Sequence, residues 1–151
     1  MAMHAQNAQD TARVEVRTRF GTLPVPQENL ITFPEGLPGF EGLDRFALFH
    51  DEDNQSVFYL QSVDDPTVRL PVTSPHWFQV DYRIALDDAE ERRLQLEPSD
   101  EIAVLVTVAD TDGDPGLRIN FQGPIIVNLD KRLAIQKALV GARGTLVIDA
   151  Q

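Results

Sequence analysis

The chain has 151 residues, 42% of them hydrophobic, and a formal net charge of −11. This length is typical of one domain with a substantial core, while so acidic a surface argues against direct binding to nucleic acid, which depends on lysine and arginine. The absence of cysteine excludes disulfides and thiolate chemistry, and because no apolar run approaches the roughly 20 residues of a membrane-spanning helix, we expect no membrane insertion and a cytoplasmic protein.

The N-terminal part of the chain is predicted to lead into a strand pair. Residues 1–11 are polar and rich in alanine and glutamine, so they are expected to form a disordered leader, with residues 12–151 as a single domain. Within Thr11–Val25, valines alternate with charged residues, which predicts a half-buried strand that turns at Gly21 and returns antiparallel. Three arginines on that strand form a basic stripe of unassigned role: Arg13, Arg17 and Arg19.

The next segment, Ile31–Phe40, contains two prolines and two glycines, which rule out a regular helix or a central strand. Its large apolar side chains, Phe33, Leu37 and Phe40, would be costly to expose to water. We therefore expect a rigid, turn-rich loop whose apolar side chains enter the core and which positions the neighbouring strands.

Short β-branched and aromatic runs then alternate with turn sequences rich in aspartate, glycine and proline. Ser56–Val63 is apolar on both faces, which predicts an interior strand, and Ile102–Val108 is predicted to be the central strand because it is the most hydrophobic run. Leu70–Val72 contains a proline and is predicted to lie at a sheet edge. Further strands are expected at Phe46–His50, Val80–Ile84, Leu117–Phe121, Ile125–Asn128, Leu133–Val140 (which also fits a helix) and Thr145–Ile148.

One helix is predicted near residues 87–96. Asp87 is a suitable N-cap, and Glu90 follows three residues later in capping-box spacing. Pro98 disfavours helical backbone at the residue before it, which limits the helix to two or three turns. Together with the many short strands, this predicts a mostly β fold: an antiparallel β-sandwich or a small barrel-like fold with one short helix.

Two acidic turns are candidates for metal or catalytic chemistry. The Asp110–Asp114 turn has the spacing of the first three ligands of a calcium loop, but Pro115 and Phe121 stand where that loop needs glycine and a bidentate glutamate. Asp64 and Asp65 resemble paired acid–base carboxylates, although an Asp-Asp-Pro sequence also favours a plain turn. We favour a binding module without metal, cofactor or catalytic residues; an enzyme or calcium-binding domain that uses these turns is the alternative.

Several motifs, in this order along the chain, give it a family resemblance. They are Ile31–Glu41 (ITFPEGLPGFE), Phe58–Pro66 (FYLQSVDDP), Asp81–Tyr82 and Asn120–Asn128 (NFQGPIIVN). Over about residues 14–136 the chain resembles the flagellar assembly factor FliW family.

The resemblance implies a small, cytoplasmic, non-enzymatic β domain with two alternating partners. Proteins of this family bind flagellin and, alternately, the RNA-binding translational repressor CsrA. When flagellin is scarce, the freed factor holds CsrA off its messenger RNA, so flagellin synthesis resumes. The negative charge agrees with a partner that offers a basic surface.

The residues expected to contact a partner are polar groups in or beside these motifs. They are Glu35, Glu41, Gln61, Ser62, Asp64, Asp65, Asn120 and Asn128. The chain departs from the family pattern after Gln136, where Lys137-Ala138-Leu139 replaces Val-Ile-Leu, and residues 141–151 replace a tyrosine-containing tail. Loss of one of the two partners is therefore an open alternative.

Overall fold

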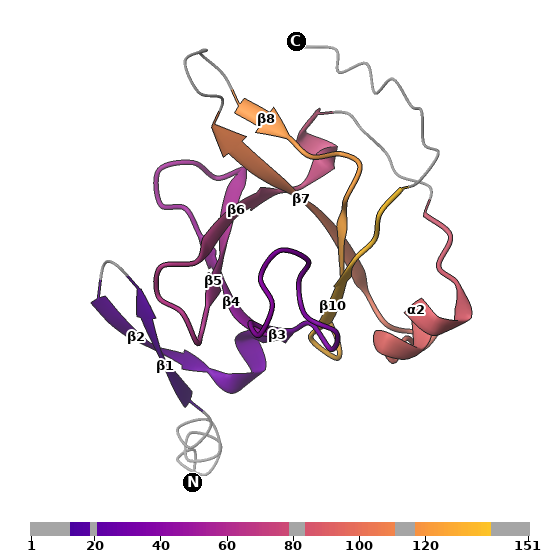
Figure 1. The fold of residues 1–151 in the computed structure, drawn as a ribbon, viewed down its shortest axis with the longest axis horizontal. Helices are drawn as coiled ribbons and strands as arrows, with labels where there is room; N and C mark the ends of the chain where they lie inside the picture. The colour runs from indigo at the N-terminus through magenta and orange to yellow at the C-terminus, as the bar shows by residue number, and fades with distance from the viewer. Residues whose placement is uncertain (1–12, 19–20, 79–83, 111–116, 140–151) are drawn as a thin grey trace, which may run out of the picture.

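The computed structural model describes residues 13–18, 21–78, 84–110 and 117–139. Within these ranges the chain is mostly β with one short α-helix, as the sequence predicts (Figure 1). The leader at residues 1–11, the strand at Thr145–Ile148, and most of Val80–Ile84 and of the Asp110–Asp114 turn lie outside the described residues. The elements are β1 (Arg13–Thr18), β2 (Gly21–Pro26), η1 (Gln27–Asn29), β3 (Leu30–Thr32), β4 (Arg45–His50), β5 (Val57–Ser62), β6 (Arg69–Thr73), η2 (Pro75–Phe78), α2 (Asp88–Arg93), β7 (Ile102–Asp110), β8 (Leu117–Ile119), β9 (Ile125–Asn128) and β10 (Leu133–Gln136).

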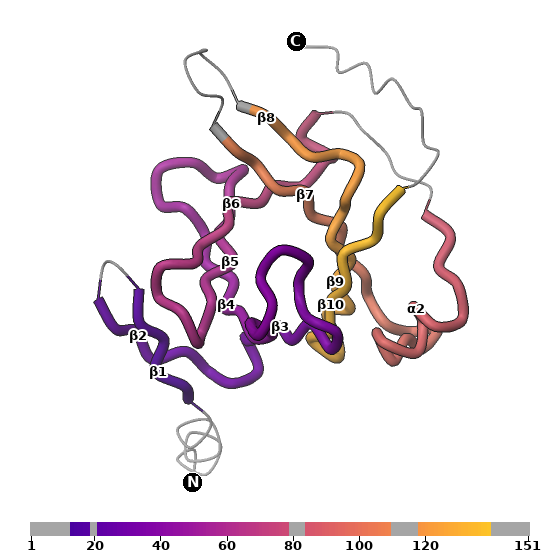
Figure 2. Tube along the Cα trace, in the orientation of Figure 1, coloured from indigo at the N-terminus to yellow at the C-terminus, as the bar shows by residue number. Residues whose placement is uncertain are grey.

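Seven strands form a closed, barrel-like sheet. Their order is β6-β5-β4-β3-β10-β9-β7, and β7 closes the ring by pairing with β6. The parallel contact in this ring is between β3 and β10, where Thr32 lies opposite Leu133; Figure 2 shows these two segments, far apart in the sequence, side by side. Of the two predicted architectures, the barrel-like one is therefore observed.

The prediction that Leu70–Val72 is an edge strand was wrong. In the structure β6 pairs with β5 on one side and with β7 on the other. Its pairing with β7 uses Val72 and Thr73, which follow Pro71, so the missing N–H of the proline does not prevent ring closure. The most hydrophobic run became β7, which pairs with β6, β8 and β9. The run Leu133–Val140 forms a strand only as far as Gln136.

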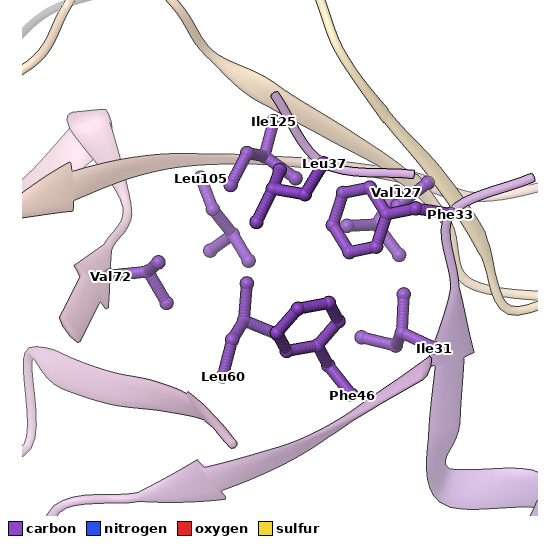
Figure 3. Close-up of a cluster of buried hydrophobic side chains, with 10 residues drawn as sticks. Ile31, Phe33, Leu37, Phe46, Leu60, Val72, Leu105, Ile125 and Val127 are labelled. Atoms are coloured by element: carbon purple, nitrogen blue, oxygen red, sulfur yellow. The ribbon is translucent and has the colours of Figure 1, made fainter. Parts of the chain in front are cut away.

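The barrel interior is filled with apolar side chains, and the loop that follows β3 supplies two of them (Figure 3). The rings of Phe33 and Phe46 meet edge to face with centroids 5.5 Å apart, and Leu37 is 4% exposed. Gly36 and Gly39 adopt φ of +78° and +91°, which turn the loop so that these side chains point inward. The expectation that Phe33 and Leu37 enter the core is confirmed, while Phe40 is partly buried against the same cluster. The loop thus plugs the barrel.

The outer face of the barrel is covered in separate patches. The β1–β2 hairpin packs Val16 and Val25 against Ala47 of β4. Leu94, at the end of α2, packs on Ile126 and Ile135, which point away from the barrel interior. Strand β9 is therefore buried on both faces, which explains the apolar run over its first three residues, Ile125 to Val127.

Helix α2 begins with the predicted capping box. The side chain of Asp87 accepts a hydrogen bond from the Glu90 N–H at 2.8 Å, and Glu90 Oε1 accepts one from the Asp87 N–H at 2.9 Å. The helix is shorter than predicted because Gln95 has a φ of 48°, which ends it before Pro98 acts. No helix in the described ranges is long and apolar enough to cross a membrane.

Candidate interaction site

A hollow beside the β3–β4 loop brings together two of the residues expected to contact a partner. Glu35 and Glu41 both line it, together with Arg93 from α2 and Gln136 from β10. Glu35 Oε2 lies 2.9 Å from Arg93 Nε, and the Glu35 side chain is 66% exposed. Glu41 is exposed as well, so both glutamates are accessible to a partner on this side of the barrel.

Asn120 does not line this hollow, but it lies near Gln136, which does. Its Oδ1 accepts a hydrogen bond from the Gln122 N–H at 3.1 Å, and Gln136 Nε2 donates to the carbonyl oxygen of Gly123 at 2.9 Å. A Cβ atom at Gly123 would lie 3.0 Å from Gln136 Nε2 and 3.1 Å from Asn120 Nδ2. The glycine therefore lets Asn120 approach Gln136, which lines the hollow.

Gln61 and Ser62 are buried and hold the turn between β5 and β6. Gln61 Nε2 donates to the carbonyl oxygens of Ser62, Pro66 and Val68 at 3.2 to 3.3 Å. Ser62 Oγ accepts from the backbone N–H groups of Asp64 and Asp65 at 3.2 and 3.0 Å. In this structure both side chains serve the fold, and their contact with a partner stays a prediction.

The two aspartates of that turn have separate contacts. Asp64 is exposed and lies 3.4 Å from Arg45 Nη2. Asp65 Oδ1 accepts from the Thr67 hydroxyl at 2.6 Å and from the Thr67 N–H at 3.0 Å, and these two bonds lower the pKa of Asp65. A lowered pKa makes a carboxyl a poor proton donor near neutral pH. This geometry favours a turn over acid–base chemistry.

Metal chemistry has little support in the described part of the chain. It contains no group of three or more histidine, aspartate and glutamate side chains that would hold an ion. The calcium-like spacing at Asp110–Asp114 falls mostly outside the described residues, so it stays untested.

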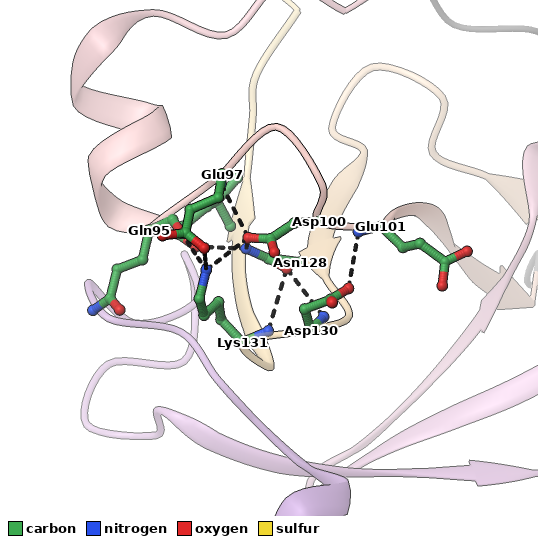
Figure 4. A network of polar contacts seen from close by, with 8 residues as sticks. Gln95, Glu97, Asp100, Glu101, Asn128, Asp130 and Lys131 are labelled. Atoms are coloured by element: carbon green, nitrogen blue, oxygen red, sulfur yellow. Dashed lines mark hydrogen bonds and ion pairs between the residues drawn. The ribbon is translucent and has the colours of Figure 1, made fainter.

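Asn128 is fully buried at the centre of a polar network that sequence reasoning did not find (Figure 4). Its Nδ2 donates to the Leu94 carbonyl oxygen and to Asp100 Oδ2, both at 2.9 Å. Its Oδ1 accepts from the N–H groups of Asp130 and Lys131 at 3.1 and 3.2 Å. Asn128 therefore ties the end of α2 to the β9–β10 turn; its contact with a partner also stays a prediction.

Asp100 and Lys131 complete the network. Lys131 Nζ lies 2.8 Å from Asp100 Oδ2, and the Asp100 side chain is 4% exposed. The hydrogen bonds from Lys131 and Asn128 lower the pKa of Asp100 to about 2, and the same ion pair raises the pKa of Lys131. The one local sign of this network in the sequence is the spacing of Glu97 and Asp100, since Asp100 Oδ2 accepts a hydrogen bond from the Glu97 N–H at 3.0 Å. The contact between Asp100 and Lys131 forms only in the folded barrel.

A closed barrel plugged by its own loop places this chain in a class of small β-rich domains with a solved representative. That representative is described as the crystal structure of the flagellar assembly factor FliW, and it matches with a TM-score of 0.74 and 27% sequence identity. The match covers 87% of this chain and 91% of that chain.

Sequence comparison identifies the family. The family described as FliW protein matches residues 15–147. The chain is 40% identical over 124 residues to the flagellar assembly factor FliW of Nitratidesulfovibrio vulgaris (strain DP4), covering 82% of this chain and 72% of that protein. It is also 40% identical over 126 residues to the flagellar assembly factor FliW of Azoarcus sp. (strain BH72), and this match covers 80% of this chain and 86% of that protein. The chain belongs to the FliW family.

Proposed function

We propose that this protein is a non-enzymatic, cytoplasmic regulator that binds flagellin and, alternately, the translational repressor CsrA. When flagellin is abundant it occupies the protein, and CsrA represses flagellin translation. When flagellin is exported, the freed protein binds CsrA and translation resumes. The observation that carries this proposal is the family match over residues 15–147.

The charge of the chain supports a basic partner. The net charge of −11 favours long-range attraction of a protein with a basic RNA-binding surface and disfavours RNA itself. The accessible polar groups near the loop hollow, Glu35, Glu41 and Asn120, give such a partner a first surface to meet.

Titration calorimetry with each partner tests the proposal. Purified protein is expected to bind flagellin and CsrA separately, and flagellin added to the CsrA complex is expected to release CsrA. If protein with a cooperative thermal transition binds neither, the proposal is wrong. If it binds only one, the departure from the family pattern after Gln136 has removed the other partner.

Charge reversal locates the contact. Glu35→Lys and Glu41→Lys are expected to weaken partner binding, whereas Glu101→Lys serves as the matched control because Glu101 is exposed and its carboxylate points away from the polar network (Figure 4). If all three changes weaken binding equally, the effect comes from net charge and the loop hollow is not the contact.

A further inference from the structure

A second hollow, of about 570 Å³, lies on the outer face of the sheet where β4 and β5 meet the β1–β2 hairpin. Leu23 of β2, Phe49 of β4 and Tyr59 of β5 contribute to its walls. Apart from the buried Gln61, none of the residues assigned above to partner binding lines it. We call this hollow the hairpin groove.

The floor of the groove is apolar and held in place. Phe49 lies directly opposite Tyr59 in the β4–β5 pairing, so both side chains are on the same face of the sheet. Phe49 also packs against the cluster under the β1–β2 hairpin, which fixes its position. Leu23 stands beside this floor and is 45% exposed, an apolar surface that water covers in the free protein. Burial of such a side chain by a partner is favourable.

The rim of the groove carries three carboxylates, of which that of Asp51 already accepts hydrogen bonds within the protein. Asp51 accepts hydrogen bonds from the Tyr59 hydroxyl at 2.6 Å and from the Asp53 N–H at 2.7 Å, which fix the turn between β4 and β5. Arg69 stacks 3.6 Å from the centre of the Tyr59 ring and offsets the charge of Asp51.

The other two rim carboxylates are available. Glu52 and Asp53 are exposed, and their carboxylates have no hydrogen-bond or ion-pair partner among the described residues. The groove therefore combines an exposed leucine, a fixed aromatic floor and two negative charges that are not paired with any cation of the described residues.

We propose that the hairpin groove docks a peptide segment of another protein that carries one large apolar side chain flanked by lysine or arginine. The apolar side chain would pack against Leu23 and Phe49, while the flanking cations would pair with Glu52 and Asp53. Charge complementarity selects this segment over an acidic one, and the apolar floor selects it over a purely basic one. This proposal does not depend on which protein supplies the segment.

A short synthetic peptide tests the groove directly. The probe is acetyl-Ser-Lys-Leu-Lys-Ser-amide, titrated into the ¹⁵N-labelled full chain and followed by backbone amide shifts. Saturable shifts are expected at Leu23, Phe49 and Asp53, and the affinity is expected to fall as salt screens the charges. Peptides with leucine replaced by serine, or lysine by glutamate, are expected to bind roughly tenfold more weakly. No saturable shift, or shifts centred on another surface, would overturn the proposal.

Variants of the protein give the matched comparison. We expect the affinity for the peptide probe to fall roughly tenfold in two variants: Leu23→Ala, and the double variant with Glu52→Lys and Asp53→Lys. Ile102→Ala removes a similarly exposed apolar side chain, 43% exposed on β7, and is expected to leave binding unchanged. Dispersed amide spectra verify that each variant is folded. Equal weakening by Ile102→Ala would refute the groove as the site. Because the probe is a peptide, this result is separate from whether flagellin or CsrA binds.

Discussion

Arg93 Nε lies 2.9 Å from Glu35 Oε2, so an ion pair joins helix α2 to the loop that plugs the barrel. Both side chains remain in contact with solvent, being 35% and 66% exposed. Ion pairs of this kind contribute little to stability because water already solvates both charges. The position of the loop is therefore determined by its buried Phe33 and Leu37 rather than by this pair.

Neutralising Glu35 is expected to leave the fold intact. Glu35→Gln should lower the free energy of unfolding by less than about 1 kcal/mol, the range of exposed ion pairs. Urea denaturation followed by circular dichroism measures this change. A larger loss would mean that the pair positions the loop, and partner-binding data for Glu35 variants would then report on folding.

Truncating Leu37 is expected to be far more damaging. Leu37→Ala removes a side chain from the barrel interior and should cost about 2–5 kcal/mol of unfolding free energy, since the plug cannot collapse into the space left behind. Glu41→Ala, on the exposed part of the same loop, should change it by less than about 0.5 kcal/mol. Comparable losses in the two variants would contradict the scaffold role of the loop.

Replacing Gly39 is expected to destabilise the protein because of its backbone conformation alone. Its φ is +91°, and a Cβ atom there would meet nothing within 4 Å. Gly39→Ala should therefore cost about 1–2 kcal/mol through the unfavourable conformation rather than a clash. Gly39→Asn should cost less, because asparagine tolerates positive φ better. Chemical denaturation of the two variants gives the ranking, and an alanine variant as stable as the parent would refute it.

The capping box predicts a graded effect at Asp87. Asp87→Ala should destabilise the protein by about 1 kcal/mol because the Glu90 N–H loses its acceptor. Asp87→Asn keeps a side-chain oxygen and should retain most of the stability. The measurement is again the unfolding free energy. If alanine and asparagine were equally destabilising, the charge rather than the hydrogen bond would be responsible.

The polar network predicts an acid-sensitive contribution from Asp100. Its pKa in the folded protein, about 2, is below the ordinary value of 3.8. The stabilisation is therefore complete above about pH 4 and is lost as the pH falls through about 2. The difference in unfolding free energy between the parent and Asp100→Asn should shrink over that window. The control is Asp44→Asn, which removes an exposed side chain that has no hydrogen-bond partner among the described residues.

Local signals in the sequence predicted local structure well. The Asp87–Glu90 capping box, the hairpin that turns at Gly21 and the inward-facing loop residues all depend on spacings within a few positions. The alternation in β1 and the apolar run in β7 likewise reflect which faces are buried.

Contacts between residues far apart in the chain could not be predicted from the sequence. Pro71 led to the prediction of an edge strand because a sequence pattern describes one strand at a time. Whether β6 has a second neighbour depends on the position of β7 in the folded barrel. Gln61, Ser62 and Asn128 stood out as polar motif residues, but burial turned them into internal hydrogen-bond partners. Two ion pairs form only in the assembled barrel: Asp100 with Lys131, which are 31 positions apart in the sequence, and Glu90 with Lys137, which are 47 positions apart.

The parallel contact between β3 and β10 has a consequence for how the chain folds. Arg132, just before β10, donates to the carbonyl oxygen of Glu28, just before β3, across 104 residues of sequence. During synthesis one side of β3 must therefore wait for a strand made much later, and contacts of such high sequence separation slow folding. We therefore expect barrel closure to be a late step, and an unpaired strand edge that stays exposed until β10 is made would favour chaperone binding or aggregation.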